Sequence, residues 1–223
     1  MKLTFSEYQL MMDLKENQTM VLVLEDPAMF SAFIEICYLQ CSGASGGIVL
    51  SERDSILSLS KTALIISDYF LLDINNRQIQ GRLFQQMKEA GNEWMMGKEE
   101  FTGYGVNLLE NILSDMGFDQ VAYDLELDWT DIFKLFRVRV EEDYNTLLEK
   151  LISYLRICAE LLRIRLLLFV NLKSYLSGEE LEELYRMAGY LKIQLLLVES
   201  HEREMLPAEQ YYIIDSDKCL IIK

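Results

Sequence analysis

The residues that most suggest chemistry are seven carboxylates near the middle of the sequence: Glu110, Asp115, Asp119, Asp124, Glu126, Asp128 and Asp131. We expect residues 121–127 to form a short strand, and alternation along it would put Asp124, Glu126 and Asp128 on one face. Clustered carboxylate oxygens suit calcium, but the spacing differs from that of an EF-hand because no glycine occupies the required middle position. The pattern alone favours a solvated acidic face and leaves a metal site open as the alternative.

Basic side chains are sparse, but several lie close together along the chain. Arg77 and Arg82 fall near the start of a predicted helix, and three more follow the acidic stretch, namely Lys134, Arg137 and Arg139. Ordinary surface ion pairing would account for each of them. A symmetric oligomer could instead gather these groups around one axis and create a basic surface on an acidic protein.

The groups that common enzymatic mechanisms require are absent from the sequence. No Gly-x-Ser-x-Gly elbow occurs, and the single histidine, His201, lies among charged residues where we expect a solvated side chain. The glycine-rich residues 42–47 follow a predicted helix, whereas a phosphate loop lies between a strand and a helix and ends in Gly-Lys-Ser/Thr. We therefore predict no catalytic residues and no enzymatic activity.

Polar residues end several predicted strands, where α/β sheets place their ligands. They are Asp26, Asp68, Asn171 and Glu199. Asn171 stands where a nucleotide hydrolase often keeps a magnesium-binding aspartate, so the sheet is expected to resemble such enzymes without their catalytic equipment. Cys37 and Cys41 are four residues apart on a predicted helix, and we interpret them as buried thiols in preference to a zinc site.

Composition limits the class of protein. The 223 residues are 51% hydrophobic, enough for a full core, and 36 acidic against 21 basic residues give a net charge of -15. This charge argues against nucleic-acid affinity across the whole surface and leaves room for a local basic patch or bound cations. The sequence shows neither a signal peptide nor an apolar run long enough to span a membrane, so we expect a soluble cytoplasmic protein.

Apolar runs and helical spacing predict the elements. Residues 165–170 and 193–198 read as buried parallel strands, with a helix between them that begins after Ser177. Further strands are predicted at 2–5 (an edge strand), 19–25, 47–51, 62–67, 211–214 and 220–222. Further helices are predicted at 27–41, 75–89, 106–116, 130–136 and 144–163, with a break at 91–105.

The predicted strands cluster in residues 1–67 and 164–223, whereas residues 68–163 are mainly helical. A single α/β domain with a mainly parallel sheet, interrupted by a helical insertion, fits this order better than two successive domains. We therefore expect an α/β head formed by residues 1–67 and 164–223 and a helical leg formed by residues 68–163.

Several stretches, taken in order, resemble the small spacer-acquisition protein of type II-A CRISPR systems. They are TMVLVLED, ALIISDYFLLDIN, LLLFVN, YLSGEEL, LLLVES and QYYIID. Together they span nearly the whole chain, and they are pattern matches without a catalytic signature.

The resemblance implies a homotetrameric ring whose subunits have a degenerate, nucleotide-hydrolase-like α/β head and a helical leg. Such rings load onto ends of double-stranded DNA through a basic central hole, without sequence preference, and work with the CRISPR integrase pair and the effector nuclease. Calcium held by acidic residues of the leg orders the ring. The family's acidic stretch corresponds to residues 110–131 here, so the expected metal ligands are Glu110, Asp124, Glu126, Asp128 and Asp131. The family does not assign the DNA contacts residue by residue, and we expect the basic groups of the leg to supply them, namely Arg77, Arg82, Lys134, Arg137 and Arg139.

Two other classes of function remain as alternatives. A nucleotide-dependent enzyme related to phosphate-loop proteins would need the missing loop, and a nucleotide titration would identify it. A protein-interaction scaffold would lack DNA affinity at any calcium concentration, and a comparison of linear with circular DNA would separate it from the ring.

Overall fold

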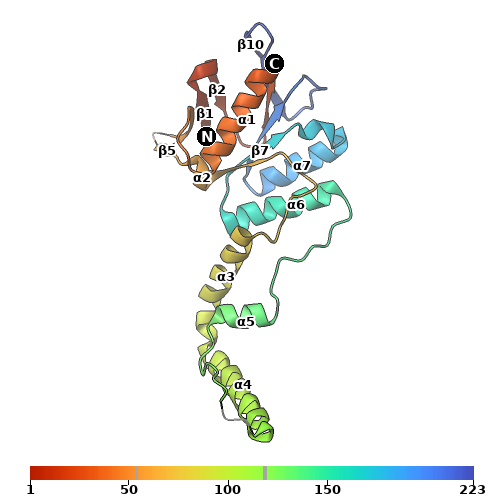
Figure 1. Cartoon of the computed structure of the whole chain (residues 1–223). Helices are drawn as coiled ribbons and strands as arrows, with labels where there is room; N and C mark the ends of the chain where they lie inside the picture. The colour runs from red at the N-terminus through yellow and green to blue at the C-terminus, as the bar shows by residue number, and fades with distance from the viewer. Residues whose placement is uncertain (54, 118–119) are drawn as a thin grey trace. The chain divides into compact units, whose positions relative to one another are not determined.

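The computed structural model describes residues 1–53, 55–117 and 120–223, which form two compact units (Figure 1). The first unit comprises Met1–Asp73 and Asp143–Lys223, and the second comprises Ile74–Glu142. The insertion thus begins and ends inside the expected range of 68–163. Helix α6 (Leu147–Ile157), which the sequence analysis placed in the leg, belongs to the first unit, where it contacts α7 (Gly178–Tyr190).

A six-stranded sheet in the order β10-β9-β3-β8-β7-β6 forms the centre of the first unit. Only β10 runs antiparallel, and Leu22 of β3 pairs with Val198 of β8 and Tyr212 of β9. The prediction of a mixed α/β fold with a mainly parallel sheet is therefore confirmed. The strands are β3 (Thr19–Leu24), β6 (Ala63–Ile66), β7 (Leu166–Val170), β8 (Gln194–Glu199), β9 (Glu209–Ile214) and β10 (Leu220–Ile222).

A smaller antiparallel sheet in the order β2-β1-β4-β5 belongs to the same unit. Residues 2–5 were expected to form an edge strand, and this was wrong, because β1 pairs with β2 on one side and with β4 on the other. The strands are β1 (Lys2–Phe5), β2 (Leu10–Asp13), β4 (Ile48–Glu52) and β5 (Ser55–Leu57).

Local capping explains where the helices of the first unit begin. Asp26 accepts a hydrogen bond of 2.8 Å from the amide of Met29, and Pro27 opens α1 (Pro27–Cys41). Thr146 and Ser177 head capping boxes at α6 and α7. A short α2 (Leu59–Thr62) precedes β6, the π-helix Cys158–Leu162 continues α6, and 3-10 turns lie at Ser6–Tyr8 and Leu172–Ser174.

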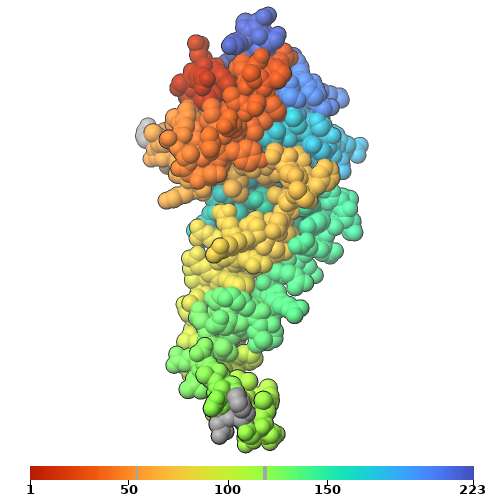
Figure 2. Space-filling model, in the orientation of Figure 1, coloured from red at the N-terminus to blue at the C-terminus, as the bar shows by residue number. Residues whose placement is uncertain are grey.

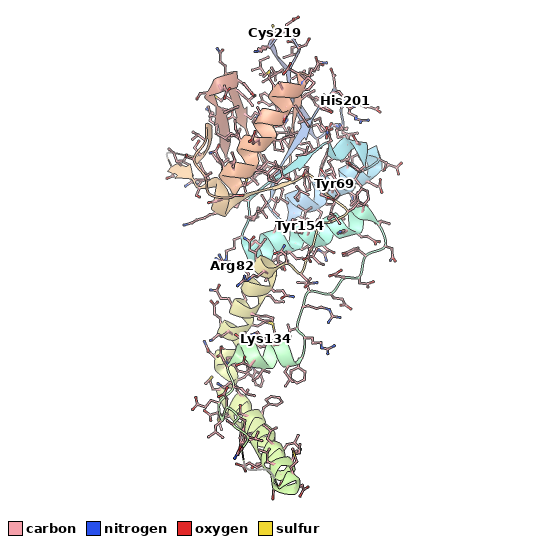
Figure 3. All side chains as sticks on the ribbon, viewed as in Figure 1. Tyr69, Arg82, Lys134, Tyr154, His201 and Cys219 are labelled. Carbon is pink, nitrogen blue, oxygen red and sulfur yellow. The ribbon has the colours of Figure 1, made fainter. Side chains whose placement is uncertain are left out.

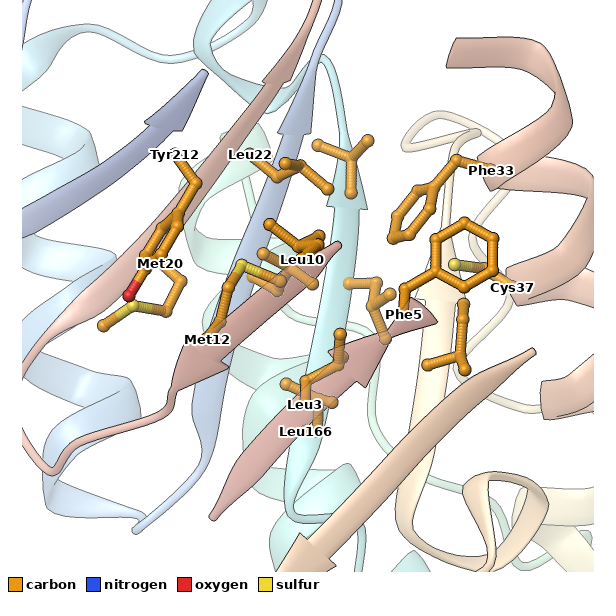
Figure 4. Close-up of a cluster of buried hydrophobic side chains, with 14 of the residues drawn as sticks. Leu3, Phe5, Leu10, Met12, Met20, Leu22, Phe33, Cys37, Leu166 and Tyr212 are labelled. Atoms are coloured by element: carbon orange, nitrogen blue, oxygen red, sulfur yellow. The ribbon is translucent and has the colours of Figure 1, made fainter. Parts of the chain in front are cut away.

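Apolar side chains from both sheets and from α1 form the core of the first unit (Figure 4). Leu3 and Phe5 of the small sheet, Leu22 of the large sheet and Phe33 of α1 are completely or almost completely buried. Each fully buried side chain of this size contributes roughly 1.5–3 kcal/mol to stability. This core fixes the strand ends that carry the polar groups described below.

The second unit is helical, with α3 (Arg77–Gly91), a 3-10 turn at Asn92–Trp94, α4 (Met95–Met116) and α5 (Trp129–Leu135). Gly91 lets α5 pack closely, since a Cβ there would lie 2.8 Å from the Trp129 ring. The expected break at 91–105 was wrong because α4 already begins at Met95. The expected strand at 121–127 was also wrong, because these residues have no regular secondary structure and belong to neither of the two described sheets.

Candidate nucleic-acid and metal sites

The carboxylates nominated for calcium lie on different elements of the second unit. Glu110 is on α4, where its Oε1 accepts a hydrogen bond of 3.3 Å from the hydroxyl of Tyr123. Asp124 and Glu126 are exposed in a segment without regular secondary structure. The remaining two, Asp128 and Asp131, lie at the start of α5.

Asp128 and Asp131 already have structural partners. Asp128 is the N-cap of α5, and Asp131 Oδ2 accepts a hydrogen bond of 3.1 Å from the Asp128 amide. Lys88 Nζ lies 3.1 Å from Oδ1 and 3.0 Å from Oδ2 of Asp128. This hydrogen bond holds the pKa of the Asp128 carboxyl below its ordinary value. The lysine ammonium therefore occupies the position beside Asp128 that a cation would take.

These carboxylates do not form a calcium site as they are arranged. Among the residues that the structure describes, no three Asp, Glu, His or Cys side chains come together as a metal-binding group. Asp119, which belongs to the acidic stretch, lies outside the described residues. Calcium needs six to eight oxygen ligands, so binding would have to gather side chains that the structure keeps apart. Calcium binding here stays a prediction.

Replacing Lys88 with methionine tests whether calcium and this lysine compete for Asp128. We expect millimolar calcium to raise the melting temperature relative to chelator, and to raise it further in Lys88→Met. Binding to the folded state alone stabilises by about 1.4 kcal/mol when calcium is tenfold above its dissociation constant. Differential scanning fluorimetry in chelator and in calcium measures the shift. Lys98→Met in the same unit is the control. Melting curves that are the same in chelator and in calcium for the unchanged protein and for both variants would argue against the site.

The five nominated basic residues are exposed on the second unit and have no acidic partner among the described residues. Arg77 and Arg82 are on α3, Lys134 is on α5, and Arg137 and Arg139 follow α5. No carboxylate of residues 1–53, 55–117 or 120–223 lies within 4.0 Å of any of their charged nitrogens. Arg82 donates instead to the amide oxygen of Gln85 at 3.2 Å. Figure 3 labels Arg82 and Lys134.

Contacts within the second unit bring part of this basic set together. Phe84 of α3 and Phe133 of α5 pack with ring centroids 5.5 Å apart, so the two helices that carry Arg82 and Lys134 are neighbours. Arg139 Nη1 approaches the carbonyl of Arg137 at 3.5 Å. The arrangement offers several unpaired cations, which is the chemistry that phosphate groups require.

Helix α4 has an apolar stripe with no covering element in the described chain. None of its 22 residues is buried. Tyr104, Leu108, Ile112 and Met116 recur every fourth residue and are 78%, 62%, 47% and 62% exposed, and Figure 2 shows the surface to which α4 contributes. An exposed apolar stripe of this length is typical of a helix that packs against a partner.

The polar residues at the strand ends hold the backbone. Asp26 caps α1, and Asp68 Oδ1 accepts hydrogen bonds from the amides of Phe70 and Leu71 at 3.1 and 2.9 Å. Asn171 Oδ1 accepts one from the Ser200 amide at 2.9 Å. His201 is exposed, as expected. Of the two cysteines expected to be buried, Cys37 is buried, and desolvation raises the pKa of its thiol, whereas Cys41 is only partly buried. These contacts give Asp26, Asp68 and Asn171 a structural role.

Glu199, at the end of β8, is completely buried. Its Oε1 accepts a hydrogen bond of 3.1 Å from the Lys173 amide, whereas its Oε2 has no hydrogen-bond partner in the described structure. Burial raises the pKa of this carboxyl from 4.5 to about 7, because desolvation outweighs the attraction of Arg203 and Lys173. The sequence analysis had noted Glu199 only as a strand-end residue.

A buried ion pair, which the sequence did not reveal, lies near Glu199. Lys173 Nζ is 2.8 Å from both carboxylate oxygens of Glu209, and these side chains are 5% and 0% exposed. Lys173 also donates to the Tyr211 hydroxyl at 2.7 Å, and the Tyr185 hydroxyl donates to Glu209 at 2.7 Å. The two charged residues are 36 positions apart, so no local spacing could have indicated the pair.

None of the helices in the described part of the chain is both long and apolar enough to cross a membrane.

Comparison with known proteins gives consistent matches. The family model described as CRISPR-associated protein (Cas_Csn2) matches residues 40–218. A CRISPR-associated protein Csn2 of Streptococcus agalactiae is 25% identical over 207 residues, which cover 90% of this chain and 89% of that protein. One from Enterococcus faecalis is 19% identical over 202 residues, covering 88% of each. The crystal structure of Stu0660 of Streptococcus thermophilus aligns with a TM-score of 0.60 at 16% identity, over 96% of this chain and 75% of that one.

Proposed function

The chain belongs to the CRISPR-associated Csn2 family, and we propose that it is a non-catalytic, ring-forming protein that binds ends of double-stranded DNA during spacer acquisition. The observation that carries this proposal is the set of five exposed basic side chains on the second unit that lack a carboxylate partner in the described part of the chain. In a chain with a net charge of -15, such unpaired cations are a local exception.

Phosphate contacts are the chemistry that these side chains support. Arginine and lysine neutralise phosphates irrespective of base sequence, so the binding would be non-specific and would weaken as salt rises. One subunit supplies few such groups, whereas a symmetric ring repeats each of them around its axis. Repetition therefore concentrates positive charge around the axis, although each chain is acidic as a whole.

Self-association would cover the apolar stripe of α4. Leu108 and Ile112 are exposed in the single chain, and leaving large apolar side chains in water forgoes about 25 cal/mol for each Å² that could be buried. We propose that a second copy of the chain packs on this stripe within a homotetramer. The CRISPR integrase pair and the effector nuclease are the further partners that the type II-A family suggests.

Structural roles of the strand-end residues support a non-catalytic protein. Asp26, Asp68 and Asn171 each accept hydrogen bonds from backbone amides, so their oxygens are engaged in shaping the loops. The sequence offers no phosphate loop beside them. A nucleotide-dependent enzyme and a scaffold without DNA affinity are the alternatives that the following experiment distinguishes.

Charge reversal of Arg82 tests the DNA-binding surface. We expect Arg82→Glu to weaken binding of linear duplex DNA and to reduce the dependence of log affinity on log salt by about 0.9 for every phosphate that the ring no longer neutralises. Fluorescence anisotropy over a series of salt concentrations measures both quantities. Lys15→Glu, at an exposed position of the first unit, is the matched control. Equal binding of covalently closed and linearised DNA would contradict end loading, and salt-independent affinity would contradict phosphate recognition.

The role of α4 is examined with the same DNA. Ile112→Asp puts a charge in the apolar stripe and is expected to dissociate the assembly and to abolish DNA binding together. Sedimentation velocity reports the first effect and anisotropy the second. Ile56 is also an exposed isoleucine but lies in the first unit, so Ile56→Asp should change neither the assembly nor DNA binding. A dissociated Ile112→Asp protein that binds DNA as the unchanged protein does would show that the ring is not required.

A further inference from the structure

A cavity of about 850 Å³ opens in the first unit, at the amino ends of the large sheet's strands. Thr19 at the start of β3 and Gln194 at the start of β8 line it, together with Tyr185 and Gly189 of α7. Its volume is within the range of about 300–1,000 Å³ that is usual for small-molecule sites. α/β folds usually bind nucleotides at the carboxyl ends of their strands. This cavity lies at the other ends of the strands.

Two backbone features build the wall of this cavity. A Cβ on Gly189 would lie 2.8 Å from Asn17 Oδ1, so glycine at this position leaves room for the Asn17 side chain against α7. Lys192 follows α7 with a φ of 58°, and its amide donates to the carbonyl of Gly189 at 3.1 Å. Glycine is preferred at such a left-handed helix end. The lysine side chain is therefore not required by the turn, and glycine could replace it without strain.

Two basic side chains that line the cavity form no ion pair with any residue that the structure describes. Arg165 is engaged by Glu52, with Nη1 3.0 Å from Oε2. For Arg186 and Lys192, by contrast, no carboxylate lies within 4.0 Å in the parts of the chain that the structure describes. Two free cations match a phosphate monoester, which carries a charge of about -1.5 to -2 at neutral pH.

Two acidic side chains limit how much negative charge the cavity accepts. Glu16 and Glu182 also line it, and no basic group of the described residues forms an ion pair with either. A triphosphate would add charge beyond what the two cations neutralise and would be repelled by these carboxylates. Of the two ligands, a single phosphate group is therefore repelled less by these carboxylates than a triphosphate.

The rest of the lining suits a nucleobase. Met1, Pro207 and Ala208 line it at partly or fully exposed positions and offer an apolar surface. The side chains of Leu14, Ile193 and Leu195 are buried behind it. The amides of Gln18 and Gln194 lie in the same lining. Gln18 Nε2 donates to Gln210 Oε1 at 3.3 Å, which leaves the Gln18 oxygen as an acceptor, whereas the Gln194 amide can both donate to and accept from the edge of a base. Apolar walls with a few polar groups are typical of sites that bind and orient a small ligand.

We propose that this cavity binds a nucleoside monophosphate, either as a free nucleotide or as the 5′-terminal nucleotide of a DNA strand. Arg186 and Lys192 bind the phosphate, and the apolar residues with the two glutamine amides bind the base. The site requires neither the ring nor threading of duplex DNA, so its failure and the failure of the proposed function are distinguishable.

Isothermal titration calorimetry of the full chain with deoxyadenosine monophosphate tests the proposal. We expect saturable binding to the unchanged protein, and about tenfold weaker binding for deoxyadenosine, which lacks the phosphate, and for Lys192→Gly. Lys218→Gly is the matched control, because Lys218 also has a positive φ, of 63°, and does not line the cavity. Absence of saturable binding to the unchanged protein, or equal affinity of the Lys192→Gly and Lys218→Gly variants, would overturn the proposal.

Competition identifies the source of the phosphate. Hairpin DNA with a 5′-phosphate displaces deoxyadenosine monophosphate if the cavity takes a strand terminus, whereas the same hairpin with a 5′-hydroxyl does not. If neither hairpin competes, the occupant is the free nucleotide. Deoxyadenosine triphosphate should bind more weakly than the monophosphate in both cases, and tighter binding of the triphosphate would contradict the charge argument.

Discussion

Replacing Lys173 with methionine should lower the free energy of unfolding by about 3–5 kcal/mol, because it leaves the Glu209 carboxylate buried without its counterion. Both side chains are almost fully buried, and the Lys173 ammonium also satisfies the Tyr211 hydroxyl and the carbonyl of Glu204. Urea unfolding followed by circular dichroism measures the change. A shift of the transition midpoint reports it, provided that the dependence of the free energy of unfolding on urea concentration has the same slope in both proteins.

Lys223→Met is the matched control, since Lys223 pairs with Glu202 at the surface, where both side chains are nearly half exposed. An exposed pair of this kind contributes about 1 kcal/mol or less. Combining Lys173→Met with Glu209→Gln should recover part of the loss, because it removes the unpaired charge. If Lys173→Met were no more destabilising than Lys223→Met, the buried pair would not be what holds β9 to the 3-10 turn after β7.

Strands buried on both faces could be predicted from the sequence alone. The runs that became β3, β7 and β8 are apolar at nearly every position, because a sheet in the interior of an α/β fold excludes water from both sides. The helix starts at Asp26 and Ser177 were predictable for a local reason, since a cap needs only its own first turn. These features together determine the mixed α/β class.

Elements that depend on distant partners could not be predicted in this way. Residues 121–127 alternate in sequence, but a strand also needs a neighbour for its backbone hydrogen bonds, and alternation does not supply one. Strand β2 was missed because its four residues become recognisable only once β1 pairs with them. Helix α4 tolerates three glycines within its span, at a cost of about 1 kcal/mol each relative to alanine.

The candidate sites show the same limit. The sequence identified the basic residues by type. Only the structure shows that Arg82 and Lys134 lack an acidic partner among the described residues, whereas Lys88 has one in Asp128. The acidic cluster was likewise visible in the sequence, while the capping of α5 that engages Asp128 and Asp131 was not. Which charges remain available for ligands depends on pairing in three dimensions.

The charge of Glu199 should make stability depend on pH. Its pKa is about 7 in the folded protein, against 4.5 when it is exposed on unfolding. The folded state therefore binds this proton more tightly, so the carboxyl imposes no penalty below about pH 4.5 and destabilises the fold progressively as the pH rises to about 7. The full difference corresponds to roughly 3 kcal/mol above that range.

Glu199→Gln should remove this dependence. The carbonyl oxygen of glutamine can accept the same hydrogen bond from the Lys173 amide as Oε1 does. Its amide nitrogen then takes the place of Oε2, which has no hydrogen-bond partner in the described structure. We expect the variant to match the unchanged protein at about pH 4.5 and to be more stable by up to roughly 3 kcal/mol at about pH 8. Urea unfolding at a series of pH values measures the free energy of unfolding of both proteins. The contributions of groups that titrate in both proteins cancel in the difference between the two free energies. Glu204→Gln, at an exposed position of the segment that follows β8, controls for the loss of one negative charge. Parallel pH profiles for Glu199→Gln and the unchanged protein would show that the buried carboxyl does not titrate in this range.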